Sequence, residues 1–259
     1  MYDEITYDVD NGIATVMIDR PDVHNAFTER TIEELNDALE QFHENETAYV
    51  AVLTGADNGF CAGADVNTMP DWAEQSKEDY ASFLDGVQDV VRNLRESAKP
   101  TVAAVGGPAI GAGCDMALAC DLRVVGSDAV LREGFVKIGL VPGDGGAWLL
   151  PRLIGEAKAR EYLLTGRDIS PEAAVEMGLA VEIADNALIA ARDIAAEIKD
   201  MPAQAVRLTN RLLNGDESFE DHAQRAIEYQ WDCITDPEHK EAVAAFREKR
   251  EPEFDRDFS

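Results

Sequence analysis

The stretch of residues 106–115 contains residue types and spacings that suit acyl chemistry. Residues 101–105 form an apolar run that reads as a buried strand, and small apolar residues at helical spacing follow the glycines. A glycine-rich turn of this kind leaves backbone N–H groups free at a helix N-terminus, where the dipole favours negative charge. Asp115 follows Ala112 by three residues, which puts an amide and a carboxylate on one side of the first turn. The pattern predicts a site that stabilises an enolate and moves a proton, although small residues equally suit close helix–sheet packing.

A second stretch has the same character. Residues 50–55 read as a strand, and residues 58–66 follow it with small side chains that present a backbone N–H near Ala64. Together the two stretches resemble the enoyl-CoA hydratase/isomerase (crotonase) superfamily, in which a Phe-x-Ala-Gly-x-Asp loop and a later Gly-x-Gly turn each give one amide to an oxyanion hole. The resemblance implies that the N–H groups of Ala64 and Ala112 bind the thioester carbonyl. The family commonly has Gly at the second position, and Ala keeps the donor.

The resemblance covers nearly the whole chain, because residues 20–27, 139–146, 163–179 and 245–250 match further family segments in order and spacing. It implies an α/β fold, a crotonase-like spiral of β-β-α units with a C-terminal α-helical trimerisation region. The expected division is a spiral core with the acyl-CoA site at 1–195 and a helical oligomerisation region at 196–259. The family forms trimers, often paired into hexamers. Periodicity alone indicates only an α/β protein with a largely parallel sheet.

Individual elements can be read from turns and apolar spacing. Residues 5–9 and 13–18 flank Asp10-Asn11-Gly12, which predicts a β-hairpin. Thr28 is a suitable N-cap for a helix, and two more strands are expected around a turn at Ser127-Asp128. Further elements follow from the same patterns: a helix at 80–96, and C-terminal helices at 202–213, 218–233 and 237–250.

The catalytic acids are less clear. Family hydratases use two glutamates, and the matching positions here are Asp115 and Phe135, so the second glutamate is absent. Glu133 is a candidate substitute, because in an extended segment it would face the same side as Phe135; the alternative is an exposed acid. Asp144 is the other candidate. Isomerases of the family place an aspartate one position earlier, at Gly143, and Asp144 could instead cap the following helix.

The resemblance also implies residues that contact coenzyme A or the acyl group. Phe246 and Lys249 match an aromatic and basic pair that reaches the CoA site of a neighbouring subunit, although Lys249 could also be a solvated salt-bridge partner. His24 lies in the segment that contacts CoA in the family, or is a plain surface residue. The full set of expected contacts is Val23, His24, Ala62, Asp65, Phe135, Phe246 and Lys249.

The composition limits the setting in which the chain works. With 51 acidic and 23 basic residues among 259, its formal charge is −28. An acidic surface over an ordinary core indicates a salt-rich, halophilic cytoplasm; an ordinary acidic bacterial enzyme is the alternative.

The charge argues against nucleic-acid binding. The four cysteines lack metal or disulfide spacing, and no signal or membrane-spanning segment is recognised, so no metal site and no membrane association are expected.

These observations predict an acyl-CoA enzyme that passes through a thioester enolate. Enoyl-CoA hydration and double-bond isomerisation, in fatty-acid or aromatic-acid degradation, are the leading reactions. The rivals are a decarboxylase or C–C hydrolase with the same oxyanion hole, and a catalytically weak acyl-CoA-binding member. No cofactor is expected beyond the CoA of the substrate.

Overall fold

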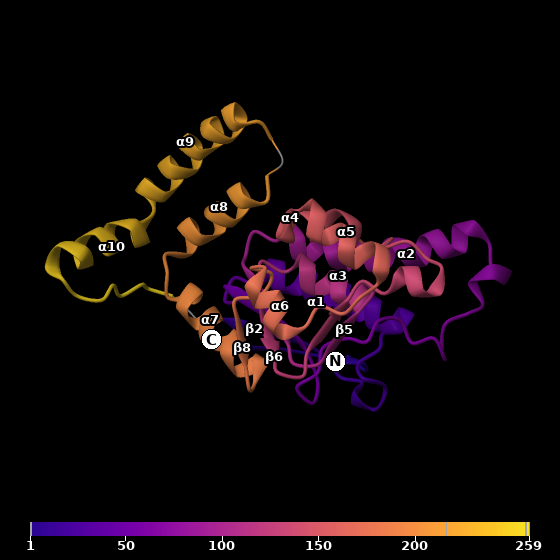
Figure 1. The fold of residues 1–259 in the computed structure, drawn as a ribbon. Helices are drawn as coiled ribbons and strands as arrows, with labels where there is room; N and C mark the ends of the chain where they lie inside the picture. The colour runs from indigo at the N-terminus through magenta and orange to yellow at the C-terminus, as the bar shows by residue number, and fades with distance from the viewer. Residues whose placement is uncertain (1, 216, 257, 259) are drawn as a thin grey trace.

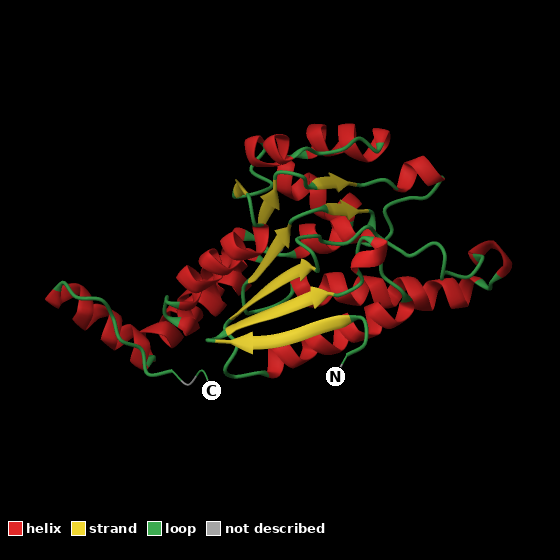
Figure 2. Cartoon of the chain, turned by 90° about the horizontal axis from the view of Figure 1, so that it is seen from below, coloured by secondary structure: helices red, strands yellow, loops and turns green. Residues whose placement is uncertain are grey.

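A central six-stranded sheet organises the molecule (Figures 1 and 2). The structure is a computed structural model that describes residues 2–215, 217–256 and 258. The strand order is β1-β2-β3-β4-β6-β8, and every neighbouring pair is parallel except β1 with β2. The strands of this sheet are β1 (Ile5–Asp10), β2 (Ile13–Ile18), β3 (Val50–Gly55), β4 (Thr101–Val105), β6 (Leu122–Gly126) and β8 (Glu182–Ala184). The expected α/β class is therefore confirmed.

The hairpin of β1 and β2 forms as the sequence predicts. Asp10 pairs with Ile13, and the two turn residues between them, Asn11 and Gly12, both have positive φ angles, of 48° and 79°. Asn and Gly tolerate this conformation, and turns with two such residues match the twist of the flanking strands. On its other edge β2 pairs in parallel with β3, from Ile13 opposite Val50 to Ile18 opposite Gly55.

Helices cover both faces of the sheet. The alternation of side chains in β3 sends Val50 and Val52 towards α7, where they pack with Ala191, while Leu53 packs with α1 and α2 on the other face. Both faces of β3 are thus buried, which explains its uninterrupted apolar sequence. The helices are α1 (Glu29–Glu44), α2 (Lys77–Arg95), α3 (Ala112–Ala119), α4 (Gly146–Ile154), α5 (Glu156–Thr165), α6 (Pro171–Glu176), α7 (Ala187–Lys199), α8 (Ala203–Leu213), α9 (Phe219–Thr235) and α10 (Pro237–Glu248).

The glycine-rich turn differs from the simple strand–turn–helix expected. Residues 108–110 form a short strand, β5 (Pro108–Ile110), which pairs in parallel with β7 (Val130–Arg132) in a second, two-stranded sheet. This pairing joins segments about twenty residues apart, so local sequence could not reveal it. It brings the ends of β5 and β7 side by side and thereby sets the segments after them at one site.

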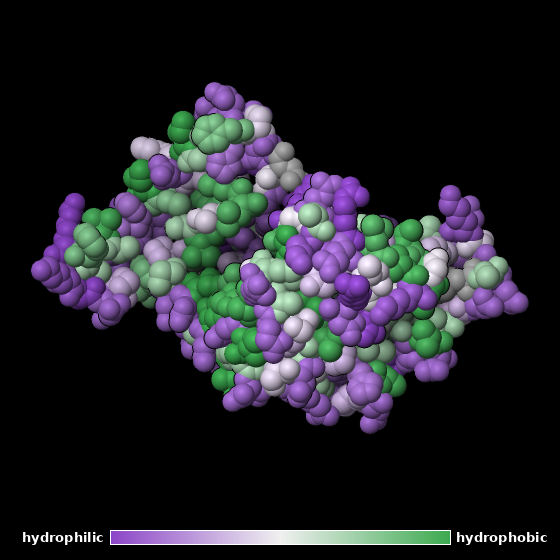
Figure 3. Space-filling model, viewed as in Figure 1, coloured by the Kyte–Doolittle hydropathy of each residue, from purple (hydrophilic) through white to green (hydrophobic). Residues whose placement is uncertain are grey.

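The C-terminal helices α8–α10 extend away from the body of the molecule (Figure 1). Hydrophobic side chains gather on the side of this arm that faces the body, and hydrophilic ones cover much of the outside (Figure 3). The division expected at residue 195 falls inside α7, which packs on β3, β4 and β6; the division itself stays a prediction. Within the described residues, no helix has the length and apolar character needed to cross a membrane.

Candidate active site

A cavity of about 500 Å³ opens between the loop after β3, helix α2 and the segments that follow β5 and β7. Its walls are mostly apolar. Val66, Ile138 and Val141 stand on its walls with 72–80% of their surface exposed, and Arg132 and Lys137 add positive charge to the lining. Ala64, Ala112, Ala62, Phe135 and Asp144 all line this cavity, which brings together five of the residues expected from the sequence.

Ala64 presents a backbone N–H that has no partner. On either side of it, Phe27 N donates to Gly63 O at 2.9 Å and Asp65 N donates to Phe27 O at 2.8 Å. These two bonds fix the peptide units around Ala64, whose own N–H makes no hydrogen bond within the described part of the chain. Ala64 is exposed and lines the cavity, so the amide is available to a ligand there.

Ala112 supplies a second amide that has no hydrogen-bond acceptor among the described residues. It is the first residue of α3, where an N–H has no carbonyl one turn earlier to accept it. Gly111 before it has a φ of 55° and donates its own N–H to Arg132 O at 2.8 Å. That positive φ favours glycine and turns the chain so that Ala112 begins the helix at the cavity wall.

The two amides are held in one rigid frame. Cys61 N donates to Pro108 O and Ile110 N donates to Cys61 O, both at 3.0 Å. The contact is so close that a Cβ on Gly113 would stand 2.2 Å from Cys61 O, which only glycine permits. Two amides without partners in the described part of the chain, both at residues that line one cavity, form an arrangement of the kind that stabilises developing negative charge on a carbonyl oxygen.

Asp144 is the only carboxylate among the described residues that line this cavity. It lies in the turn between Gly143 and Gly145 that precedes α4, and Gln88 on α2 holds this turn by donating to Gly143 O at 2.8 Å. The residue is buried, and burial raises the pKa of its carboxyl group to about 6. Its side chain does not cap α4, whose N-cap is Gly145 without a side-chain hydrogen bond.

Asp115 and Glu133 do not reach the cavity. Their exposed fractions are 0% and 1%, and neither is among the residues that line it. Glu133 was expected to share a side with Phe135 if the segment were extended. Instead a short 3-10 helix begins at Phe135 (Phe135–Ile138), so the alternation ends before it. Of the two, Phe135 faces the cavity and Glu133 turns inward, which corrects the expectation of Glu133 as either a substrate-facing or an exposed acid.

Phe135 occupies the position at which the resemblance placed a second glutamate. The tip of its ring lies against Gly111, where a Cβ would stand 3.4 Å from the ring. The ring therefore covers the backbone next to the Ala112 amide. An apolar ring at this point cannot orient water or transfer a proton, so Asp144 is left as the one carboxylate among the described residues on the cavity wall.

Asp65 is not on the cavity wall. Arg20 donates to its carboxylate at 3.1 Å, and Asn67 N donates to the other carboxylate oxygen, also at 3.1 Å. Both carboxylate oxygens thus accept hydrogen bonds within the protein, which fixes the loop, and the expected contact of Asp65 with a ligand stays a prediction. Val23 and His24 do not line the cavity either, although His24 is exposed and its carbonyl accepts a hydrogen bond from Ala62 N at 3.2 Å.

Phe246 and Lys249 lie far from the cavity of their own chain. They stand at the end of α10, on the arm that projects from the opposite side of the molecule from α2 (Figure 1). Phe246 is 86% exposed. A contact with coenzyme A through these two residues therefore requires a second copy of the chain and stays a prediction.

Helix α2 contributes a wall that was not assigned to the site from the sequence. Phe83 and Val87 were read as part of an apolar stripe, and the structure places them, with Tyr80 and Leu84, along the cavity. The stripe alone does not distinguish packing against a core from lining a cavity, because both need apolar residues at the same spacing.

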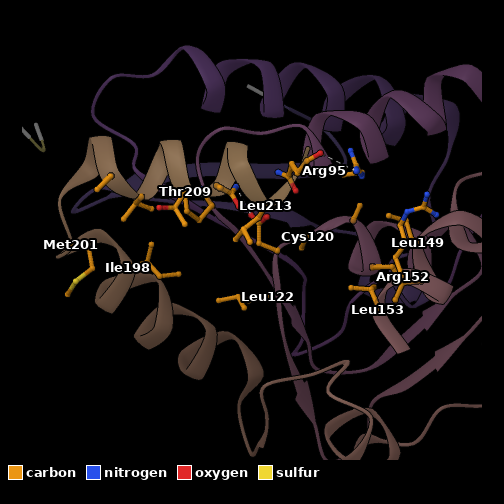
Figure 4. A pocket seen from close by; sticks show the side chains of 18 of the residues that line it. Arg95, Cys120, Leu122, Leu149, Arg152, Leu153, Ile198, Met201, Thr209 and Leu213 are labelled. Carbon is orange, nitrogen blue, oxygen red and sulfur yellow. Dashed lines mark hydrogen bonds between the residues drawn. The ribbon is translucent and has the colours of Figure 1, made fainter. Parts of the chain in front are cut away.

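A larger cavity, of about 610 Å³, lies elsewhere, between α4, the end of α7 and α8 (Figure 4). Trp148 stands on its wall with the guanidinium groups of Arg95 and Arg152 stacked on the indole, at 4.3 and 3.6 Å. Its one acid, Asp121, accepts hydrogen bonds from Thr101 and Asn210. The one described carboxylate on that wall is thus tied into the fold through its Oδ2 atom, which makes the smaller cavity the better candidate for chemistry.

The comparisons with known proteins agree with the geometry. The model of the enoyl-CoA hydratase/isomerase family matches residues 8–257. The chain belongs to the enoyl-CoA hydratase/isomerase family. This confirms the resemblance seen in the sequence, and the members of this family are lyases and isomerases.

Two of the similar proteins are named for different reactions, an isomerisation and a hydration. The chain is 32% identical to the 1,2-epoxyphenylacetyl-CoA isomerase of Escherichia coli, with 98% of this chain and 99% of that protein covered. It is 31% identical to the crotonyl-CoA hydratase of Syntrophomonas wolfei, with 98% of each covered. Among solved structures, an enoyl-CoA hydratase from Bacillus anthracis superposes with a TM-score of 0.91 at 29% identity, over 97% of this chain and 99% of that one. The crotonase fold is thereby confirmed, and the names of the similar proteins include both hydratases and an isomerase, hydratases being the more frequent.

Proposed function

We propose that the protein moves the double bond of an enoyl-CoA, and that Asp144 transfers the proton. The observation that carries this proposal is the single carboxylate on the cavity wall. Hydration needs one group to protonate C2 and another to orient water at C3. An isomerisation needs only one carboxylate that removes a proton from one carbon and returns it to another. The apolar Phe135 ring in place of a second acid therefore favours isomerisation.

The proposed reaction balances with the groups present. The thioester carbonyl of a 3-enoyl-CoA accepts hydrogen bonds from the amides of Ala64 and Ala112. The carboxylate of Asp144 takes a proton from C2, and the electron pair of the broken C–H bond spreads into a dienolate whose oxygen the amides stabilise. Asp144 then returns the proton to C4, which yields the conjugated 2-enoyl-CoA and restores the carboxylate. No cofactor takes part beyond the CoA of the substrate.

The acyl group in this proposal occupies the apolar part of the cavity, between α2 and the segment from Phe135 to Val141. The likeness to a 1,2-epoxyphenylacetyl-CoA isomerase supports an isomerase, and the likeness to crotonyl-CoA hydratase keeps hydration as an outcome to be measured. The proposed place of the reaction is the degradation of fatty or aromatic acids, where double bonds must be brought into conjugation with the thioester.

The test uses 3-hexenoyl-CoA as substrate, with absorbance of the conjugated thioester as the readout and chromatography of the products. We expect 2-hexenoyl-CoA to form and Asp144→Asn to lower kcat by about 10²–10⁴-fold. Asp185→Asn is the matched control and should leave kcat unchanged, because Asp185 is exposed and does not line the cavity. Formation of 3-hydroxyhexanoyl-CoA as the main product, or an active Asp144→Asn variant, would contradict the proposal.

The pH dependence gives a second check. A base must be ionised to accept a proton, and burial raises the pKa of Asp144 to about 6. The value of kcat/KM should therefore fall as the pH drops through about 6, rather than through the range of an ordinary aspartate near about 4. A profile that is flat down to pH of about 4 would exclude Asp144 as the base.

A further inference from the structure

Two carboxyl groups that the proposed reaction does not use meet in the interior behind the cavity. Asp115 projects from α3 and Glu133 from the segment after β7. A Cβ on Gly146 would stand 2.3 Å from an Asp115 oxygen and 2.4 Å from a Glu133 oxygen. Both side chains thus press on the same point of the backbone at the start of α4, and their carboxyl groups lie within hydrogen-bonding reach of each other.

Nothing else in the described part of the chain satisfies this pair. None of its four carboxyl oxygens accepts a hydrogen bond of normal geometry from another described residue, and the nearest donors are the Gly146 N–H beside Asp115 and the Cys114 thiol beside Glu133. The titratable groups that face it are the thiol of Cys114, also on α3, and the carboxyl group of Asp144 before α4. A side chain at residue 146 would collide with both carboxyl groups, so this position requires glycine.

Two adjacent carboxylates cannot both stay ionised in such a place. Burial raises the pKa of Asp115 and of Glu133, and for Asp115 the charge on Glu133 raises it further. A proton held between the two oxygens removes the repulsion and supplies the hydrogen-bond donor that the protein does not provide. The pair then titrates as a unit and carries one negative charge.

We propose that Asp115 and Glu133 share one proton at neutral pH and that the remaining negative charge of the pair makes Asp144 a stronger base. Asp144 is two residues before Gly146. Its negative charge raises the pKa of both Asp115 and Glu133, and a repulsion between charges acts in both directions. Charges in a buried setting act on each other strongly because little water screens them. Asp115 and Glu133 thus act through Asp144 and do not touch the substrate. This inference rests on the proposed isomerisation.

Amide variants separate the charge of the pair from its shape. In Glu133→Gln or Asp115→Asn, the amide N–H donates to the remaining carboxylate, so each single variant keeps one donor and one negative charge. The double variant Asp115→Asn/Glu133→Gln keeps the shape and the hydrogen bond but has no charge. Comparing single and double variants therefore isolates the charge.

The first readout is infrared difference spectroscopy at neutral pH, which detects the carbonyl stretch of a protonated carboxyl group. We expect the unaltered protein to show one such band that is resistant to exchange with D₂O. Both single variants should lose it, because neither still holds the shared proton. This measurement does not depend on activity, so it tests the pair even if the protein proves to catalyse a different reaction.

The second readout is the pH profile of kcat/KM for isomerisation. The single variants should remain within about threefold of the unaltered protein, while the double variant should lose about tenfold and shift its acidic limb down by about one pH unit, because Asp144 becomes a weaker base. Absence of the infrared band in the unaltered protein would overturn the proposal, and so would a double variant with an unshifted profile. If the double variant does not fold, retention of the band in both single variants would overturn it as well.

Discussion

Arg20 and Asp65 are joined by a contact of 3.1 Å between guanidinium Nη2 and carboxylate Oδ2 that ties two distant segments together. Their side chains are only 16% and 5% exposed. Arg20 also donates to the carbonyl of Ala26, and Asp65 follows Ala64 directly. The contact therefore fixes the loop that presents the Ala64 amide, and its loss should affect both stability and ligand binding.

Asp65→Asn should lower the free energy of unfolding by about 2–3 kcal/mol, because a largely buried guanidinium loses its carboxylate partner while the weaker contact with Glu4 remains. Chemical denaturation measures this change. The matched control is Asp85→Asn, which breaks an ion pair with Arg92 whose side chains are 66% and 46% exposed. It should cost no more than about 0.5 kcal/mol. Equal losses in the two variants would show that burial of the Arg20 pair is unimportant.

Ala112→Pro should remove one proposed oxyanion donor without breaking α3. Proline is tolerated at the first position of a helix, where its missing N–H would have no partner within the helix. The positive φ of Gly111 is also one that a glycine before proline can adopt. We expect kcat to fall by about 10²–10³-fold, measured with 3-hexenoyl-CoA. Ala112→Gly keeps the N–H and should stay near the unaltered rate; a similar loss in both variants would point to steric effects.

Salt should stabilise the protein strongly. The formal charge of −28 on 259 residues makes the folded chain repel itself, and raising the ionic strength from about 0.1 to 1 M shortens the screening length from about 10 to 3 Å. Thermal unfolding followed by circular dichroism should show a Tm that rises steeply with KCl and nearly equally with NaCl. A Tm indifferent to both salts would contradict the halophilic interpretation.

The C-terminal arm should hold copies of the chain together. Ile227, Trp231 and Ile234 on α9 are 49–64% exposed, more apolar surface than an isolated helical arm normally shows to water. We expect light scattering in molar KCl to give a trimer or hexamer, and Trp231→Asp to weaken it. Ile189→Asp, at a residue of α7 that is 60% exposed, is the control away from the arm. A monomer under these conditions would refute the prediction.

The sequence predicts the elements of this fold well because each obeys a local rule. The hairpin follows from Asn11-Gly12, α1 begins at its Thr28 cap, and α9 and α10 follow from apolar spacing. The cap is the clearest case, since the Thr28 hydroxyl accepts from Thr31 N as expected of an N-cap. The pairing of β5 with β7 follows from no local rule, and it was missed.

The roles of the three acids depend on contacts that a sequence does not display. Asp115 lies at the expected place in α3, yet the start of α4 at Gly146 closes over it. Glu133 turns inward because the 3-10 helix at Phe135 interrupts the strand alternation. Asp144 reaches the cavity because Gln88, on a helix far away in the sequence, holds its turn. Each outcome is set by where a second element packs.

The two free amides of Ala64 and Ala112 are main-chain groups, and this has a consequence for the history of such a site. Replacing a side chain at either position leaves the donor in place, unless the new residue is proline. The carboxyl groups and Phe135, in contrast, are side chains on separate segments that single substitutions can exchange. The polarisation of the thioester carbonyl can therefore persist through substitutions, while proton transfer moves from one side chain to another. A lineage can in this way change its reaction and still bind the thioester.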